Sequence, residues 1–246
     1  MRFKDLLKLL LTLILFSFFA ACSSDDDDGP TEPDDNGDSP PTINVKQVTV
    51  PQTMQTAAQN GDPGATQAMT FMNLANSLPS YAQLFNPPQG SGKVSSTSAA
   101  SGEWTWTQDG TTFTLTSTET AEGYKLTLTI DGTFNGKSYS NQILMESTVS
   151  KDGNTGEVLF YDPDSGSPAL TFNWETEADG TYHLDMEAGS EYGGFTGQMV
   201  VNPDNSGTLD LDYSSGERWE IQWTSNSGSW TLYNADGSVA QTGNWP

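Results

Sequence analysis

This chain of 246 residues has little of what most catalytic and nucleic-acid-binding sites are made of. It contains one cysteine, one histidine and nine lysines and arginines, against 32 aspartates and glutamates. A single cysteine cannot form a disulfide within the chain. Nine basic side chains are too few to form a positive stripe that would displace the counterions of phosphates. Nucleic acid is therefore not an expected partner. The formal net charge of −23 instead suits cations, basic partners or a salty medium.

Catalytic motifs are equally scarce. No nucleophile elbow of the G-x-S-x-G type occurs, and no His or Cys set has metal-ligating spacing. The only histidine, His183, alternates with Tyr182 and Leu184, so we expect it on the water-facing side of a strand.

Carboxylate pairs are the one catalytic feature that the chain offers in number. Three pairs have i, i+2 spacing: Glu175 with Glu177, Asp185 with Glu187, and Asp210 with Asp212. Each pair alternates with apolar residues and therefore faces water, where nothing raises a pKa as the acid of a glycosidase requires. We predict that the chain is not an enzyme, and a glycan-acting enzyme is the least favoured alternative.

The one long apolar run, Leu9 to Phe19, is too short to cross a bilayer as a resident helix. It follows a basic head at residues 1–8 and precedes the small residues Ala20 and Ala21. This is the layout of a secretory signal, so we predict a signal peptide at residues 1–21. Its removal takes away three of the nine bases and a single acid.

The residues around the only cysteine resemble a known processing site. Phe19-Ala20-Ala21-Cys22 is similar to the lipobox of bacterial lipoproteins, with Phe19 where that family more often has Leu. The resemblance implies diacylglycerol on the Cys22 sulfur, cleavage before Cys22 and acylation of the new amino terminus. Three acyl chains exceed what stable anchoring requires, so membrane lipid is an expected partner. The alternative is an ordinary cleaved signal that leaves a free thiol.

The stretch after Cys22 indicates location and flexibility. The run Asp25 to Asp28 is similar to the acidic export tag of surface lipoproteins from Bacteroidota-type bacteria, which implies the outer membrane or the cell surface. Residues 22–42 combine Asp, Gly, Pro and Ser without a large apolar residue. We predict a lipidated, acidic and disordered tether there.

One globular domain is expected at residues 43–246. Its first part, 43–101, should hold a strand at Ile43 to Val50, a looser turn at Thr53 to Gln59, and a helical segment. Asp62-Pro63 is a good start for that helix, and we expect Pro79 to close it. Residues 86–102 are rich in Pro, Gly and Ser and read as a linker.

From Gly102 to the end, apolar and polar residues alternate, and short Asp-Gly or Ser-Gly turns separate the alternating runs. Such turns pair successive strands as neighbours, which predicts an antiparallel up-and-down meander at residues 102–246, of about twelve strands. A sheet of that width with one apolar face must curl. The predicted fold class is therefore mainly β, curled into an open or closed barrel, with a short N-terminal α-helical segment packed on it.

This layout resembles the open-barrel fold of periplasmic lipoprotein carriers, and the resemblance implies a lipid or other hydrophobic ligand. The leading hypothesis is a membrane-anchored, non-enzymatic binding module for a hydrophobic or glycan ligand, with residues 63–78 partly plugging an aromatic concavity. The tryptophans expected to line it are Trp104, Trp106, Trp174, Trp219, Trp223 and Trp230. The alternative is a structural or adhesion lipoprotein with a core filled by Met69, Phe71 and Met72.

Two longer turns offer the hard oxygens that Ca²⁺ prefers. One contains Asp162 and Asp164, and the other contains Asn202 and Asp204. Pro-Asp residues followed by Gly are also what a plain turn requires, and neither loop has the later Glu of an EF-hand. We therefore favour ordinary turns over Ca²⁺ sites at these four residues.

Overall fold

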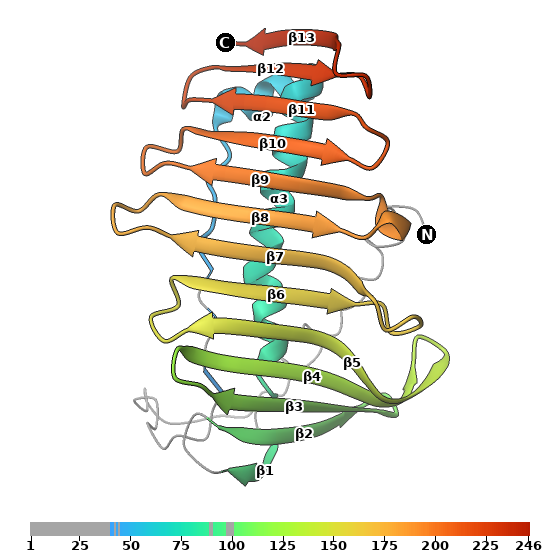
Figure 1. Cartoon of the computed structure of the whole chain (residues 1–246). Helices are drawn as coiled ribbons and strands as arrows, with labels where there is room; N and C mark the ends of the chain where they lie inside the picture. Colours follow the sequence, from blue (N-terminus) through green and yellow to red (C-terminus); the bar gives the residue numbers. More distant parts are fainter. Residues whose placement is uncertain (1–39, 42, 44, 89–90, 97–100) are drawn as a thin grey trace, which may run out of the picture.

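The described part of the chain forms a single antiparallel sheet with helices on one side (Figure 1). The computed structural model describes residues 40–41, 43, 45–88, 91–96 and 101–246. The predicted signal peptide at 1–21, Cys22 and the tether as far as residue 39 lie outside the described residues. The mainly β meander with a helical segment packed on it is confirmed.

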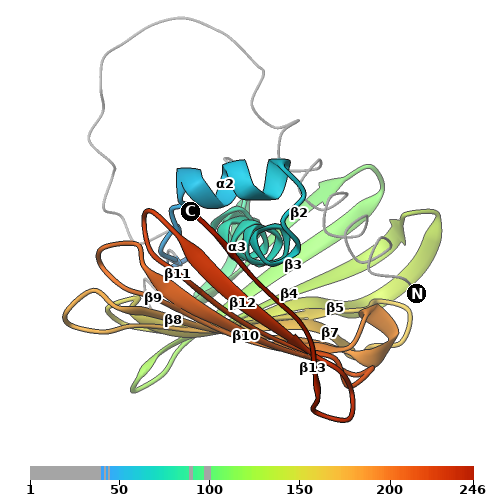
Figure 2. The ribbon, with the colours of Figure 1, turned by 90° about the horizontal axis from the view of Figure 1, so that it is seen from above.

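The sheet has thirteen strands, and their order in space is their order in the chain. Every neighbouring pair is antiparallel, and the two ends of the sheet, β1 and β13, do not pair with each other. The sheet is therefore open, and it is twisted and curled (Figure 2). The strands are β1 Gly92–Ser96, β2 Gly102–Gln108, β3 Thr111–Glu119, β4 Gly123–Phe134, β5 Lys137–Ser150, β6 Thr155–Tyr161, β7 Pro168–Thr176, β8 Tyr182–Ala188, β9 Phe195–Val201, β10 Gly207–Tyr213, β11 Arg218–Trp223, β12 Gly228–Tyr233 and β13 Val239–Trp245.

The short turns lie between successive strands, as the sequence predicts. In the β2–β3 hairpin, Asp109 has φ 50° and Gly110 has φ 80°. Two central residues with positive φ are what a two-residue type I′ turn requires, and its twist matches that of the flanking strands. Asn135-Gly136, which the sequence analysis did not single out, joins β4 to β5 in the same way, with φ 51° and 77°.

Helix α3 (Pro63–Ala82) lies across the strands on the inner side of the sheet (Figures 1 and 2). Its contacts advance strand by strand: Gly64 meets Trp230 of β12, Gln67 bonds Tyr213 of β10, Phe71 packs on Phe195 of β9, and Tyr81 packs on Phe160 of β6. From Gly64 to Tyr81 the helix rises about 26 Å, and six steps between strands cover about 29 Å. The helix axis therefore runs along the direction in which the strands are stacked.

The core fills the space between α3 and the sheet. The apolar face of the helix is almost fully buried, at Ala65, Ala68, Phe71, Met72, Ala75 and Leu78. Inward-facing residues of the strands, such as Leu126, Leu184 and Leu209, belong to the same core and are each 0% exposed. The expected packing of a Met- and Ala-rich helix on a sheet is thus confirmed. Among the described helices, none combines the length and hydrophobicity needed to cross a membrane.

The prediction of a strand at Ile43 to Val50 is wrong. The described residues of this segment form no strand. The N–H of Val48 donates to Asn76 Oδ1 over 2.7 Å, and Asn76 Nδ2 donates to the Val48 carbonyl over 2.8 Å. One helix side chain thus satisfies the backbone groups that a neighbouring strand would otherwise pair, so Val48 can be buried beside α3.

Three other boundaries also differ from the predictions. The looser turn at Thr53 to Gln59 is a helix, α2 (Gln52–Gln59). Pro79 does not close α3, because the buried Tyr81 and Ala82 hold the last turn against the sheet. A 3₁₀ turn, η1 (Gln83–Phe85), follows, and a second, η2 (Ser190–Tyr192), precedes β9. The linker predicted at 86–102 contains β1, whose backbone pairs with β2.

Candidate functional site

The six candidate tryptophans lie on the inner side of the sheet but along most of its width. Trp104 and Trp106 are on β2, Trp174 is on β7, and the other three are on β11 and β12. From β2 to β11 there are nine strand steps, about 43 Å. The structure brings Trp219 and Trp230 together, with ring centroids 5.4 Å apart, but it does not gather all six around one cavity.

Most of these rings serve as core. Trp104, Trp174, Trp223 and Trp230 are at most 4% exposed. Trp106 is half-buried and stacks on Phe113, with centroids 5.5 Å apart. The rings therefore carry packing contacts first, and only the edges of Trp106 and Trp219 reach the solvent.

A glycine faces several tryptophans of the sheet, Trp174 and Trp223 among them, across a strand pair. Gly156 pairs with Trp174, Gly207 with Trp223, and Gly228 with Trp245. A Cβ added at each of the three glycines would lie 2.0 to 2.6 Å from an indole carbon. Because no side chain could fit there, the indole covers the glycine and the strands are locked in register. These glycines were not among the predicted site residues, although Gly at one end of a strand and Trp at the facing end of the next strand is a pattern that the sequence contains.

The indole N–H groups of two of these pairs bond to a hairpin turn. Trp174 Nε1 donates to the Gly153 carbonyl over 3.4 Å, and Trp223 Nε1 donates to the Asn205 carbonyl over 2.9 Å. Trp245 Nε1 is buried and finds no such acceptor among the described residues. Each Gly–Trp pair thus stabilises the end of a hairpin, a structural role that accounts for these rings without a ligand.

The four residues considered for Ca²⁺ bond mostly within their own turns or to neighbouring side chains. Asp162 accepts from the Asp164 N–H over 2.8 Å and from the Tyr192 hydroxyl. Asp164 bonds Lys137 and accepts from the Tyr139 hydroxyl over 2.8 Å. These two donors lower the pKa of Asp164, and burial together with the bond to Asp164 raises the pKa of Tyr139 to about 12.

The second turn behaves in the same way. Asp204 accepts from the Ser206 N–H over 2.9 Å, and Asn202 Nδ2 donates to Ser206 Oγ over 2.9 Å. In the described part of the chain, no three His, Cys, Asp or Glu side chains are grouped so that they could hold a metal ion. The turn chemistry thus explains the residue types of both loops.

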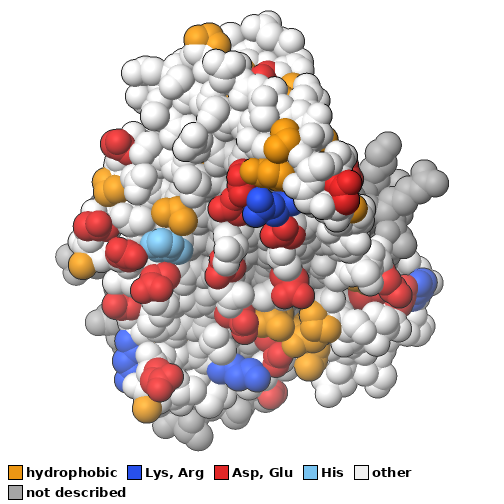
Figure 3. All heavy atoms as spheres, turned by 45° about the horizontal axis from the view of Figure 1, so that its top comes forward, with side chains coloured by type: hydrophobic (Ala, Val, Ile, Leu, Met, Phe, Trp, Pro, Cys, Tyr) orange, Lys and Arg blue, Asp and Glu red, His pale blue; other side chains and the backbone are white. Residues whose placement is uncertain are grey.

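The outer side of the sheet carries the largest group of charges near its middle. We define the acidic face as Asp185, Glu187, Asp210, Asp212 and Glu220, from strands β8, β10 and β11. One cross-strand row runs Asp185, Gln198, Asp210 and Glu220, and the next runs Glu187, Thr196, Asp212 and Arg218. Figure 3 shows acidic side chains spread over this side of the molecule. Most of this face lines a shallow depression of about 330 Å³.

The charges of the acidic face are unevenly balanced. Arg218 Nη2 lies 2.7 Å from Glu220 Oε1, and the Tyr233 hydroxyl donates to the other oxygen over 2.6 Å. Asp210 has no such partner among the described residues: burial raises its pKa, the neighbouring Glu220 raises it further, and Arg218 lowers it only in part. All five carboxylates remain open to water, which suits attraction of cations better than proton transfer.

His183 lies where the sequence predicted, on the outer side of the sheet. Its Nε2 is 2.9 Å from Glu177 Oε1, and both side chains are over 40% exposed. No serine or cysteine is bonded to this imidazole in the described residues. The pair is a surface contact between the ends of one hairpin.

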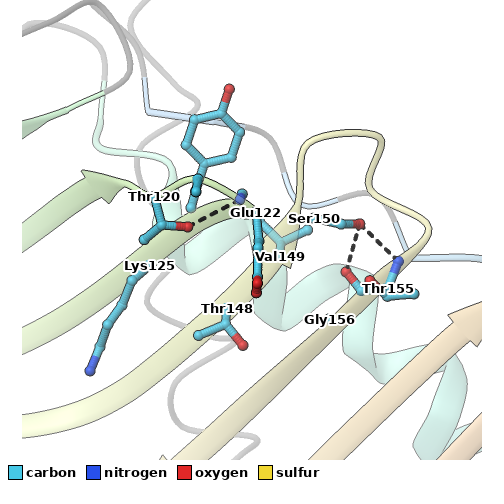
Figure 4. A pocket seen from close by; sticks show the side chains of 11 residues that line it. Thr120, Glu122, Lys125, Thr148, Val149, Ser150, Thr155 and Gly156 are labelled. Carbon is cyan, nitrogen blue, oxygen red and sulfur yellow. Dashed lines mark hydrogen bonds between the residues drawn. The ribbon is translucent and has the colours of Figure 1, made fainter.

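A second depression, of about 520 Å³, lies at the turn ends of β4, β5 and β6 (Figure 4). Its polar groups are largely used locally: Thr120 Oγ1 accepts from the Gly123 N–H, and Ser150 Oγ bonds both the N–H and the carbonyl of Thr155. Lys125 extends away from Ser150 and Thr155 and is paired with Glu146 at 3.2 Å. The depression offers hydroxyls at its rim but no nucleophile with a base.

Comparison of the chain with models of known protein families and with curated proteins finds no match.

Proposed function

We propose that this chain is a membrane-anchored bacterial lipoprotein without enzymatic activity, and that it presents the outer side of its sheet as an interaction surface. Between the two hypotheses drawn from the sequence, the packing favours the structural or adhesion protein over the carrier of a hydrophobic or glycan ligand. The observation that carries this choice is the filled interior: Phe71 and Met72 are 3% and 0% exposed, and Met69 packs against the same core.

The class of partner follows from charge. The acidic face attracts cations or a basic protein, and nothing on it provides the buried acid that hydrolysis of a glycan needs. The attachment is proposed from the resemblance of Phe19-Ala20-Ala21-Cys22 to a lipobox, with the outer membrane or cell surface as its location.

The anchor is tested with Cys22→Ser expressed in a bacterial host. Fractionation is expected to move the protein from the envelope lipids to the soluble fraction, because the acyl chains attach to that sulfur. A Ser23→Ala chain, changed one residue further on, is the matched control and is expected to stay with the membrane. Retention of Cys22→Ser in the membrane would refute the anchor.

The interaction surface is tested with polylysine as a cationic probe. Replacing Asp185, Glu187 and Asp212 by their amides is expected to weaken binding more than the same loss of charge at the exposed Asp109, Glu122 and Glu191, because the first set is clustered. Binding is also expected to fall as salt rises. Equal weakening by both triple variants would leave only a general effect of net charge. A tryptophan fluorescence shift with fatty acids or oligosaccharides would favour the carrier hypothesis instead.

A further inference from the structure

The last strand of the sheet, β13, is an exposed edge with unusual composition. Within the described residues it pairs only with β12, and α2 and α3 lie beneath it on the inner side (Figure 2). An edge strand presents a row of unpaired backbone N–H and C=O groups that can template another strand. Proteins usually protect such edges with charged residues, proline, a short strand or a covering segment.

Charged residues and proline, two of the usual protections, do not occur in β13, although its register with β12 shifts at a β-bulge between Val239 and Gln241. Its sequence, Val-Ala-Gln-Thr-Gly-Asn-Trp, has no charge and no proline, and Val239 is 57% exposed. The opposite edge differs, because β1 has five residues and includes Lys93. The two edges of the sheet are therefore not equivalent, and only the C-terminal one is left open by its sequence.

The edge is also held firmly in place. Trp230 of β12 covers Gly243 of β13, and Trp245 of β13 covers Gly228 of β12. Both tryptophans are buried, at 4% and 3% exposure. These reciprocal pairs hold a strand that is paired on one side only, so its outward backbone groups are preorganised for pairing.

Charge indicates what kind of strand it accepts. Two molecules that each carry −23 repel one another, and they can meet closely only where the surface is neutral. From Thr224 to the end of the chain the only charged side chain is Asp236, and strands β12 and β13 have none. Figure 3 shows this end of the molecule almost free of acidic and basic side chains. A basic partner is expected to bind the acidic face instead of this uncharged edge.

We propose that β13 pairs antiparallel with β13 of a second copy of this chain, forming a two-fold symmetric dimer with one continuous sheet. Full overlap of the strands places Thr242, at the centre of Val239–Trp245, opposite Thr242 of the second copy. Thr242 already faces Thr231 of the neighbouring strand β12. A row of threonine hydroxyls would therefore continue from β12 through the interface. A two-fold contact of this kind closes on itself and stops at the dimer.

The dimer is expected to be weak in dilute solution. One strand pair buries less than the approximately 1,200 Å² typical of stable complexes. Chains held on one surface meet at a much higher effective concentration, so pairing strengthens wherever the molecules share a membrane.

Sedimentation of the full chain in detergent, over a range of concentrations, tests the proposal. The wild type is expected to show a monomer–dimer equilibrium. Thr242→Lys sets two ammonium groups opposite each other and is expected to raise the dissociation constant about fivefold or more. Thr208→Lys, which adds the same charge on the exposed side of β10 between the uncharged Val200 and Gln222, is the matched control and is expected to dimerise like the wild type.

Disulfide formation gives a second, residue-specific readout. Thr242→Cys is expected to form a covalent dimer on mild oxidation, because facing residues of an antiparallel pair lie within disulfide reach. Thr208→Cys, on the exposed side of β10, is not expected to do so. A wild type that stays monomeric and a Thr242→Cys that fails to cross-link would overturn the proposal and point to a strand of a different protein. Species larger than a dimer would also overturn it, because they require an open-ended contact.

Discussion

At Asn76, one amide side chain takes the place of a neighbouring strand. Its oxygen and nitrogen bond both backbone groups of Val48, at 2.7 and 2.8 Å, where the Val48 residue is only 4% exposed. A buried N–H and C=O left without partners cost more free energy than the net gain of an ordinary hydrogen bond. The position of the segment before α2 thus depends strongly on a single residue of α3.

Replacing Asn76 with alanine is expected to lower the free energy of unfolding by about 1–3 kcal/mol, because Val48 then keeps two buried unpaired groups. Urea unfolding followed by tryptophan fluorescence measures the change. Asn73→Ala, one turn away on the exposed side of α3, is the control and is expected to stay within about 0.5 kcal/mol of the wild type. Because alanine favours a helix more than asparagine does, a small gain of equal size in both variants would mean that only helix propensity had changed.

At the scale of elements, the alternation of apolar and polar residues predicted most strands, and the Asp-Gly turns predicted their order. That information is local, because a short turn can only join neighbours. The segment before α2 was mispredicted for the opposite reason: Ile43, Val45 and Val50 suit a strand, but the backbone of Val48 pairs with a side chain 28 residues away. The prediction that the helix ends at Pro79 was wrong for the same reason, because the local sequence does not show that Tyr81 packs on Phe160.

The same difference between local patterns and long-range contacts applies to the candidate site. Alternation correctly assigned Trp174 and Trp223 to the apolar side of the sheet, but it could not say what lies over them. Whether an inward aromatic ring lines a cavity or fills a core depends on how closely α3 approaches, and that approach depends on small residues. Gly64 is the clearest case, since a Cβ there would lie 2.1 Å from the Trp230 ring.

The start of α3 combines a cap with a contact to the sheet. Asp62 Oδ1 accepts from the Ala65 N–H over 2.8 Å, and Oδ2 accepts from Trp230 Nε1 over 3.4 Å. Asp62→Ala removes both bonds and is expected to lower the free energy of unfolding by about 1–2 kcal/mol. Asp62→Asn can still cap the helix and is expected to lose less in thermal or urea unfolding. A loss as large for asparagine as for alanine would show that the negative charge, rather than the hydrogen bonds, stabilises this end.

At the scale of the whole molecule, excess negative charge is concentrated on one side of a thin sheet. Asp210 faces Glu220 across β10 and β11, whereas Asp212 faces Arg218 on the same two strands. Like charges directly opposite each other destabilise a strand pair, and opposite charges stabilise it. Neighbouring carboxylates on one strand are therefore expected to have opposite effects on stability.

Asp210→Asn is expected to raise the free energy of unfolding at pH 7 by about 0.2–1 kcal/mol, and Asp212→Asn to lower it or leave it unchanged. Folding raises the pKa of Asp210 above its ordinary value of 3.8, so ionisation of this group disfavours the folded state. The gain from asparagine should therefore be present at neutral pH and disappear below about pH 3.8, where the aspartic acid is protonated in both states. Urea unfolding at several pH values measures this, and a gain that persists at pH 3 would contradict the electrostatic cause.

Because α3 runs across the strands, its length is matched to the width of sheet that it covers. Its first turn meets β12 and its last turn meets β6, so the length of the helix determines how many strands it can cover. Inserting one hairpin between β6 and β12 would widen the sheet by about 9.6 Å, which corresponds to about six further helical residues. A change in strand number without a matching change in helix length would leave apolar side chains of the new strands without a cover. Insertions in the two regions are therefore expected to occur together, although they lie far apart in the chain.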